Sequence, residues 1–66
     1  MEITKARDET MGVICSNLIQ ASLLLPKEAA TYLGTLQRYT NVELAEILCE
    51  SRVELDRYLE QNWNLN

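Results

Sequence analysis

The chain of 66 residues contains no histidine and no phenylalanine, and it has one proline, two glycines and two cysteines. Without histidine, a zinc site or imidazole acid–base catalysis would lack its most frequent side chain. Cys15 and Cys49 lie far apart and form no CxxC pair, so neither a redox motif nor a metal motif is present. We therefore expect both cysteines to be small buried hydrophobic residues, and we expect no metal or other cofactor.

Basic residues and long apolar runs are also scarce. Six lysines and arginines stand against ten acidic residues, which gives a net charge of −4. This balance differs from the basic composition that binding to phosphates requires. Apolar runs such as Leu23 to Leu25 are far too short to span a membrane, and the N-terminus lacks the pattern of a signal peptide. The expected location is the cytoplasm, with reduced thiols.

Glycine and proline are absent between Thr40 and Asn62, a stretch with the pattern of one long amphipathic helix. Thr40 and Glu43 have the spacing of a capping box, in which each side chain bonds the backbone N–H of the other residue. At about 100° per residue the apolar side chains fall on one stripe, in which Ser51 is the polar exception. The stripe consists of Leu44, Ile47, Leu48, Leu55, Tyr58 and Leu59.

Two further helices are predicted before this one. Asp8 is the expected N-cap of the first, and residues 1–7 are expected to be a frayed lead-in. Pro26 ends the first helix and suits the first position of the next. The predicted fold class is therefore all-α, a single small domain over residues 1–66 with three helices at approximately 8–24, 26–38 and 40–62.

The apolar pattern also predicts the core. Met11, Ile14 and Leu18 from the first helix would pack against Leu44, Leu48 and Leu55 from the third. The second helix would turn a further set inward, namely Ala29, Tyr32, Leu33, Leu36 and Tyr39. Gly34 weakens this helix, which is expected to be the least stable. Gly12 indicates either a close helix–helix approach or simple tolerance of a glycine near a helix start.

Both long helices carry apolar side chains on more than one side. A chain of this size buries only about 60% of its unfolded surface, and a small core often needs additional stabilisation from a disulfide, a metal or a partner chain. A homodimer would supply this stabilisation, and the candidate interface residues are Val13, Ile19, Leu23, Leu24, Val42 and Val53. The alternative is that these are scattered exposed aliphatic residues. Trp63 would fold back as a lid or join a partner surface.

Two segments resemble DNA-binding elements. Residues 41–60 are similar to a helix-turn-helix, but Cys49 stands where the turn normally has glycine and Glu50 where an apolar residue usually closes it. Uninterrupted helix fits these residues better. Residues 28–34 are similar to the opening helix of excisionase-type regulators, but no basic helix follows. We also find no nucleophile–base pair and no Gly-rich phosphate loop, so an enzyme is not expected.

Residues 9–19, ETMGVICSNLI, combine an acid, Met11 followed by Gly12, and apolar positions at helical spacing that end in two aliphatic residues. This segment resembles the first core helix of the small enterobacterial biofilm and acid-resistance regulators of the AriR/YmgB type, which include two-component-system connector proteins. Leu25 and Lys27 also fit the start of that family's second helix. Gly34 departs from the family, which tends to have an aliphatic residue there.

The resemblance implies a three-helix homodimer that binds regulatory proteins and has no catalytic residues. The expected function is therefore that of a small non-enzymatic regulatory protein, which modulates a signalling or transcription pathway by protein–protein interaction. One alternative is a helix-turn-helix DNA-binding transcriptional regulator. A second alternative is a phage- or plasmid-borne inhibitor of a host protein.

Overall fold

The computed structural model describes the backbone of residues 2–63 and the side chains of residues 6–62. Within that range the chain forms α1 (Glu2–Gln20), a single 3-10 turn η1 (Pro26–Glu28), α2 (Ala29–Leu36) and α3 (Asn41–Trp63). The predicted all-α fold with three helices is confirmed for this part of the chain. The side chain of Trp63 lies outside the described residues, so its expected role stays a prediction.

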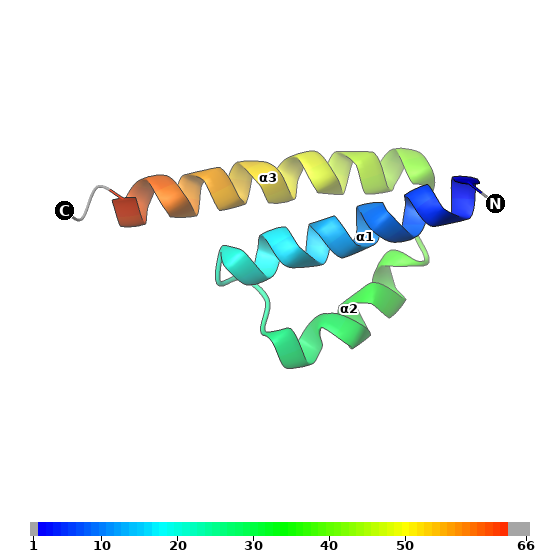
Figure 1. Ribbon diagram of the computed structural model, residues 1–66, viewed down its shortest axis with the longest axis horizontal. Coiled ribbons are helices and arrows are strands. Elements are labelled where there is room, and N and C mark those ends of the chain that lie inside the picture. The colour runs from blue at the N-terminus through cyan, green and yellow to red at the C-terminus, as the bar shows by residue number, and fades with distance from the viewer. Residues whose placement is uncertain (1, 64–66) are drawn as a thin grey trace.

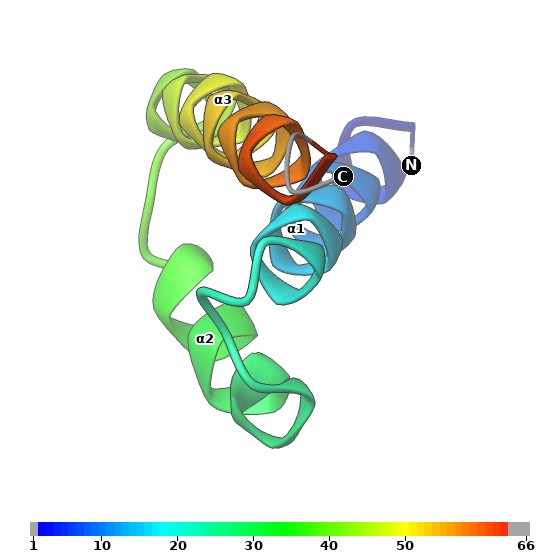
Figure 2. The same ribbon diagram turned by 90° about the vertical axis from the view of Figure 1, so that its left-hand side faces the viewer.

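The two long helices run parallel and lie side by side, and α2 runs back in the opposite direction (Figure 1). Viewed along the long axis, α1 lies between α3 and α2 (Figure 2). Consequently α1 packs against both other helices, whereas α2 makes few contacts with α3. The result is an elongated molecule of 46 × 23 × 16 Å. Between residues 2 and 63, no helix has both the length and the apolar character needed to cross a membrane.

The first helix starts and ends earlier than predicted. It begins at Glu2 and not after Asp8, which lies exposed inside the helix and is not its N-cap. The expected frayed lead-in therefore forms helix from Glu2 onward. Asp8 does not mark a helix start because the polar residues before it continue the same helix, with Arg7 held by the rest of the fold.

Ser22 explains why α1 ends at Gln20 and not near residue 24. Its φ of 62° places it in the left-handed region. The Ser22 amide then donates to the Ile19 carbonyl at 3.0 Å, and the Leu23 amide donates to the Leu18 carbonyl at 2.8 Å. This pair of bonds is the Schellman arrangement that closes many helices, usually with glycine at the left-handed position.

The start of α3 agrees with its prediction. The Thr40 amide donates to the Glu43 carboxylate at 2.8 Å, and the Glu43 amide donates to the Thr40 hydroxyl at 3.2 Å, so the capping box is confirmed. From Asn41 to Trp63 the helix is continuous. The turn that a helix-turn-helix would need within residues 41–60 is therefore absent. The helix that follows α2 is also acidic in sequence, unlike that of excisionase-type regulators.

The core lies where α1, the end of α2 and the start of α3 meet. Its buried members are Met11, Ile14, Cys15, Leu36 and Leu44, with Leu18, Leu24, Tyr32, Leu33, Ile47 and Leu48 partly buried around them. Most predicted core residues are therefore confirmed. Leu55 is only half-buried, and Leu59 is 49% exposed, because α3 extends past the end of α1 (Figure 1).

Two expectations about burial are wrong. Cys15 is buried, but Cys49 is exposed, since it lies on a side of α3 that neither α1 nor α2 covers. Both are free thiols. Tyr39 was expected to point inward and is 37% exposed, because α2 ends at Leu36 and Tyr39 belongs to the connector that follows.

Candidate interaction surface between the long helices

A groove follows the line where α1 and α3 meet, and no residue of α2 lines it. It consists of two adjoining open hollows of about 310 and 500 Å³, which share Ala6, Thr10 and Leu48. From α1 the lining residues are Ala6, Arg7, Glu9, Thr10, Val13 and Asn17. From α3 they are Asn41, Leu44, Ala45, Leu48 and Arg52. We call this surface the α1/α3 groove.

The groove follows from two matching rows of residues. Positions 6, 10, 13 and 17 have the spacing of one face of α1, and positions 41, 45, 48 and 52 have the same spacing along α3. Because the helices run parallel, the two rows lie next to each other along the same line. Ala6, Thr10 and Ala45 are small, which leaves the surface hollow between the rows.

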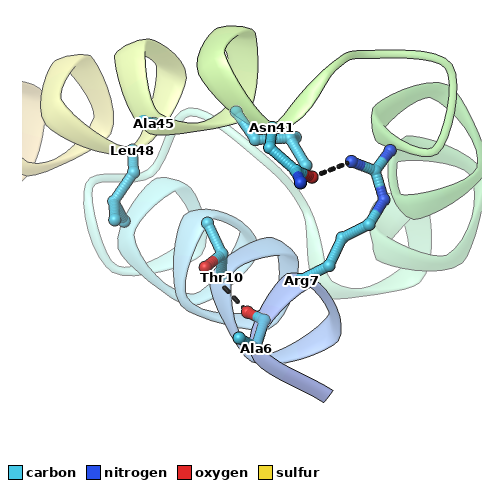
Figure 3. A pocket seen from close by; sticks show the side chains of 7 residues that line it. Ala6, Arg7, Thr10, Asn41, Ala45 and Leu48 are labelled. Carbon is cyan, nitrogen blue, oxygen red and sulfur yellow. Dashed lines mark hydrogen bonds between the residues drawn. The ribbon is translucent and has the colours of Figure 1, made fainter. Parts of the chain in front are cut away.

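Arg7 closes one end of the α1/α3 groove (Figure 3). Its guanidinium group donates to the Asn41 side-chain oxygen at 2.7 Å and to the carbonyls of Gln37 and Tyr39 at 3.0 and 2.6 Å. Thr10 donates to the Ala6 carbonyl at 2.9 Å. These polar groups are thus engaged within the chain, and Arg7 joins the start of α1 to the α2–α3 connector.

A buried polar pair lies further along the contact between α1 and α3. The Asn17 side chain donates to the Ser51 hydroxyl at 3.1 Å, and that hydroxyl donates to the Leu48 carbonyl at 2.8 Å. Asn17 is 9% exposed and Ser51 is 2% exposed. Among the described side chains, no buried nitrogen or oxygen atom lacks a hydrogen-bond partner. The pair favours one alignment of α1 against α3, because sliding would leave the buried Asn17 side chain without its partner in α3.

The sequence analysis identified Ser51 as a polar residue on an apolar stripe but missed Asn17. The available signal was the position of Asn17, one turn after Ile14 and next to Leu18 on a face that is otherwise apolar. Two polar residues, each on the buried side of its own helix, are typical of a hydrogen-bonded pair.

The charges that face the α1/α3 groove nearly balance. Among the described lining residues, Glu9 is acidic and Arg7 and Arg52 are basic. Arg7 is engaged with the connector, which leaves Glu9 and Arg52 to face a binding partner. The acidic residues in the first half of α3, Glu43, Glu46 and Glu50, do not line the groove. A second molecule that approaches here would therefore meet little net charge.

The six predicted interface residues do not share one surface. Val13 lines the α1/α3 groove and is 47% exposed. Val42 and Val53 are 72% and 52% exposed and do not line the groove. Leu23 is exposed in the turn after α1, whereas Leu24 packs against the core and Ile19 is half-buried.

The side chains capable of acid–base or redox chemistry are dispersed in the part of the chain that the structure describes. No group of three histidine, cysteine, aspartate or glutamate side chains comes together there in a way that would hold a metal ion. Burial raises the pKa of the Cys15 thiol. Burial also raises the pKa of Tyr32, with smaller contributions from Cys15, Tyr39 and Glu50. What the α1/α3 groove offers chemically is non-covalent contact.

No protein-family model matches the chain, and no similar protein was found among curated proteins or solved structures. The resemblance to regulators of the AriR/YmgB type therefore rests on residues 9–27 alone.

Proposed function

We propose that this chain is a small non-enzymatic regulatory protein of the cytoplasm, which works as a homodimer and modulates a signalling or transcription pathway by protein–protein contact. The observation that supports this proposal is the α1/α3 groove. It is a hollow surface between the two long helices, and nothing else in the described chain covers it. The resemblance of residues 9–27 to connector proteins agrees with it.

Pairing through the groove would add stability that the small core of one copy does not provide. The buried hydrophobic residues of the described chain are six, Met11, Ile14, Cys15, Ala21, Leu36 and Leu44. A core this small supplies a net stability of only about 3–5 kcal/mol unless something adds to it. Covering Val13 and the exposed edge of Leu48 with a second copy removes apolar surface from water, at roughly 25 cal/mol per Å².

The groove is suited to pair with itself. Two-fold symmetric interfaces place the same patch of each subunit against the other, so the patch must be complementary to itself. Ala6 and Ala45 allow a second backbone to approach closely, and Val13 supplies an apolar side chain to fill the opposite hollow. Glu9 of one copy and Arg52 of the partner subunit have opposite charges. The acidic residues of α3 that flank Val42 and Val53 lie elsewhere, so pairing does not bring these negative charges together.

A pair of charge-matched substitutions tests the pairing. Ala45→Glu places a carboxylate in the α1/α3 groove, and Val53→Glu places one on α3 outside the groove lining. Both positions are exposed and helical, so both variants are expected to fold, which the circular dichroism at 222 nm checks against the unsubstituted chain. Sedimentation equilibrium at micromolar concentration should then give a dimer for the unsubstituted chain and for Val53→Glu, and a monomer for Ala45→Glu.

Two results would overturn this part of the proposal. One is a monomer for the unsubstituted chain over the whole concentration range. The other is equal dimerisation of the Ala45→Glu and unsubstituted chains, which would place the contact on another surface.

Binding to duplex DNA separates regulation by protein contact from the helix-turn-helix alternative. The continuous α3 and the net charge of −4 give no support to DNA binding. Titration of the dimer with duplex DNA should therefore show no binding at physiological salt. Binding that weakens steeply as salt rises is the signature of phosphate contacts, and it would favour the alternative.

A further inference from the structure

The side of α3 that faces away from α1 carries a second apolar surface. Val42, Cys49 and Val53 lie there two and three helical turns apart, and Val42 and Val53 are 72% and 52% exposed. In Figure 2, α1 and α2 both lie below α3. The three residues are about half a turn round α3 from Leu44 and Ser51, which are buried against the rest of the fold. We call these three residues the outer strip. None of these three residues lines the α1/α3 groove.

Acidic residues accompany the outer strip along its length. Glu46 lies between Val42 and Cys49, and Glu50 and Glu54 follow on the flank of the same face. Cys49, Glu50, Val53 and Glu54 together line an open hollow of about 410 Å³. Arg57 pairs with Glu54 at 3.2 Å, one turn further along, so the negative charge is concentrated beside the middle of the strip. The surface thus combines exposed apolar groups, a hollow and an excess of negative charge around Glu46 and Glu50.

We propose that the outer strip is the docking site for a basic amphipathic helix of a partner protein. This inference rests on the proposed function, for which it names the class of partner. The charge of the surface decides the occupant, since a row of glutamates attracts lysine and arginine and repels a second copy of the same strip. A straight row of apolar side chains at helical spacing fits the apolar face of another helix, with anchors at i, i+3 or i+4, and i+7.

A synthetic peptide provides the probe. It is an amphipathic peptide of about five helical turns, with leucine at the anchor positions, lysine on both flanks and a fluorescent label. A second peptide with every lysine replaced by glutamate is the control for charge. Fluorescence anisotropy at low and at physiological salt should show binding of the lysine peptide, weaker at the higher salt, and no binding of the glutamate peptide.

Three variants separate docking on the outer strip from general attraction between opposite charges. Glu46→Lys with Glu50→Lys reverses the acidic row and should abolish binding. Asp8→Lys with Glu28→Lys changes the net charge equally at residues that line neither the outer strip nor the α1/α3 groove, and it should leave most of the binding. Val53→Asp adds negative charge to the strip but removes an apolar contact. Docking therefore predicts that Val53→Asp weakens binding about tenfold, as the loss of one anchor does.

Cys49 reports where the peptide lies. It is exposed in the middle of the outer strip, whereas Cys15 is buried and its thiol pKa is raised by that burial, so a thiol reagent such as iodoacetamide should modify Cys49 first. Saturation with the lysine peptide should slow the modification of Cys49. An unchanged rate, no binding of the peptide, or equal or tighter binding by Val53→Asp would each overturn the inference.

The dimer and the docking site on the outer strip can be rejected independently of each other. The Ala45→Glu variant, which tests dimerisation, keeps the outer strip intact and should still bind the lysine peptide. Loss of peptide binding in a chain that remains dimeric would reject the outer strip as the docking site and leave the dimer in place. Peptide binding by a chain that is monomeric at all concentrations would reject the dimer alone.

Discussion

At the scale of single residues, the structure depends on a few side chains that bond across the chain. Asn17 and Ser51 align α1 with α3, and Arg7 holds the connector before α3. Neither interaction follows from periodicity, because each joins residues at least 30 positions apart. The capping box of Thr40 and Glu43 was predictable because both partners lie within one turn. Local chemistry can be read from sequence, whereas long-range pairs require the arrangement of the helices.

Ser22 provides a prediction at this scale. Its φ of 62° is a conformation that costs a residue with a Cβ atom about 1 kcal/mol or more, and that glycine adopts freely. Part of this gain is offset because glycine also has more freedom in the unfolded chain. We expect Ser22→Gly to raise the free energy of unfolding by about 0.5–1 kcal/mol. Urea unfolding at one fixed protein concentration measures this change.

Ser22→Ala is the matched control for that measurement. Alanine keeps the unfavourable φ and loses the hydrogen bond from the Ser22 hydroxyl to the Tyr58 hydroxyl, which is 3.2 Å long. It should be no more stable than the unsubstituted chain. If Ser22→Gly proved no more stable than Ser22→Ala, the backbone conformation would not be the source of the effect.

At the scale of the elements, the three helices differ in how firmly they are held. The long helices α1 and α3 pack against each other over much of their length, whereas α2 has eight residues and one fully buried side chain, Leu36. The pattern of apolar residues predicted the number and order of the helices. It missed the end of α1, because a serine in the left-handed region has no distinct sequence signal. It predicted the packing of α1 against α3 but not the position of α2, since periodicity shows which face of a helix is apolar but not where a third helix lies.

Gly34 provides a prediction for α2. A Cβ atom built on Gly34 would have no atom within 4 Å, and the residue is exposed in the helix. Alanine is more favourable than glycine inside a helix by up to about 1 kcal/mol, so Gly34→Ala should stabilise the protein by roughly that amount. Amide hydrogen exchange, which reports local opening, should slow in α2 more than in α1 or α3.

Gly12→Ala is the matched control, since Gly12 has the same open surroundings in α1. This open space also excludes a close helix–helix approach at Gly12 within the chain, which was one of its two interpretations. Gly12→Ala should slow exchange mainly in α1. If Gly34→Ala left the exchange of α2 unchanged, α2 would not open separately from the rest of the fold.

At the scale of the whole molecule, the arrangement of three helices leaves two long surfaces of α3 uncovered. A compact three-helix bundle would bury the stripe of α3 between both other helices. Here α2 lies on the far side of α1, so the α1/α3 groove and the outer strip both remain open. The sequence analysis predicted that both long helices carry more apolar side chains than one copy can bury, and Val13 and Val53 are exposed. The sequence analysis did not assign Val13 and Val53 to two separate surfaces, because the spacing of apolar residues does not show on which side of α1 the helix α2 packs.

The central claim is that one copy of this chain leaves more apolar surface exposed along α1 and α3 than a stable monomer tolerates. The most direct test is the molar mass of the purified, unsubstituted chain by light scattering at micromolar concentration. One chain has a mass of 7.6 kDa, and the account predicts a particle of twice that value. A particle of one chain mass at every concentration at which the protein is folded would contradict it.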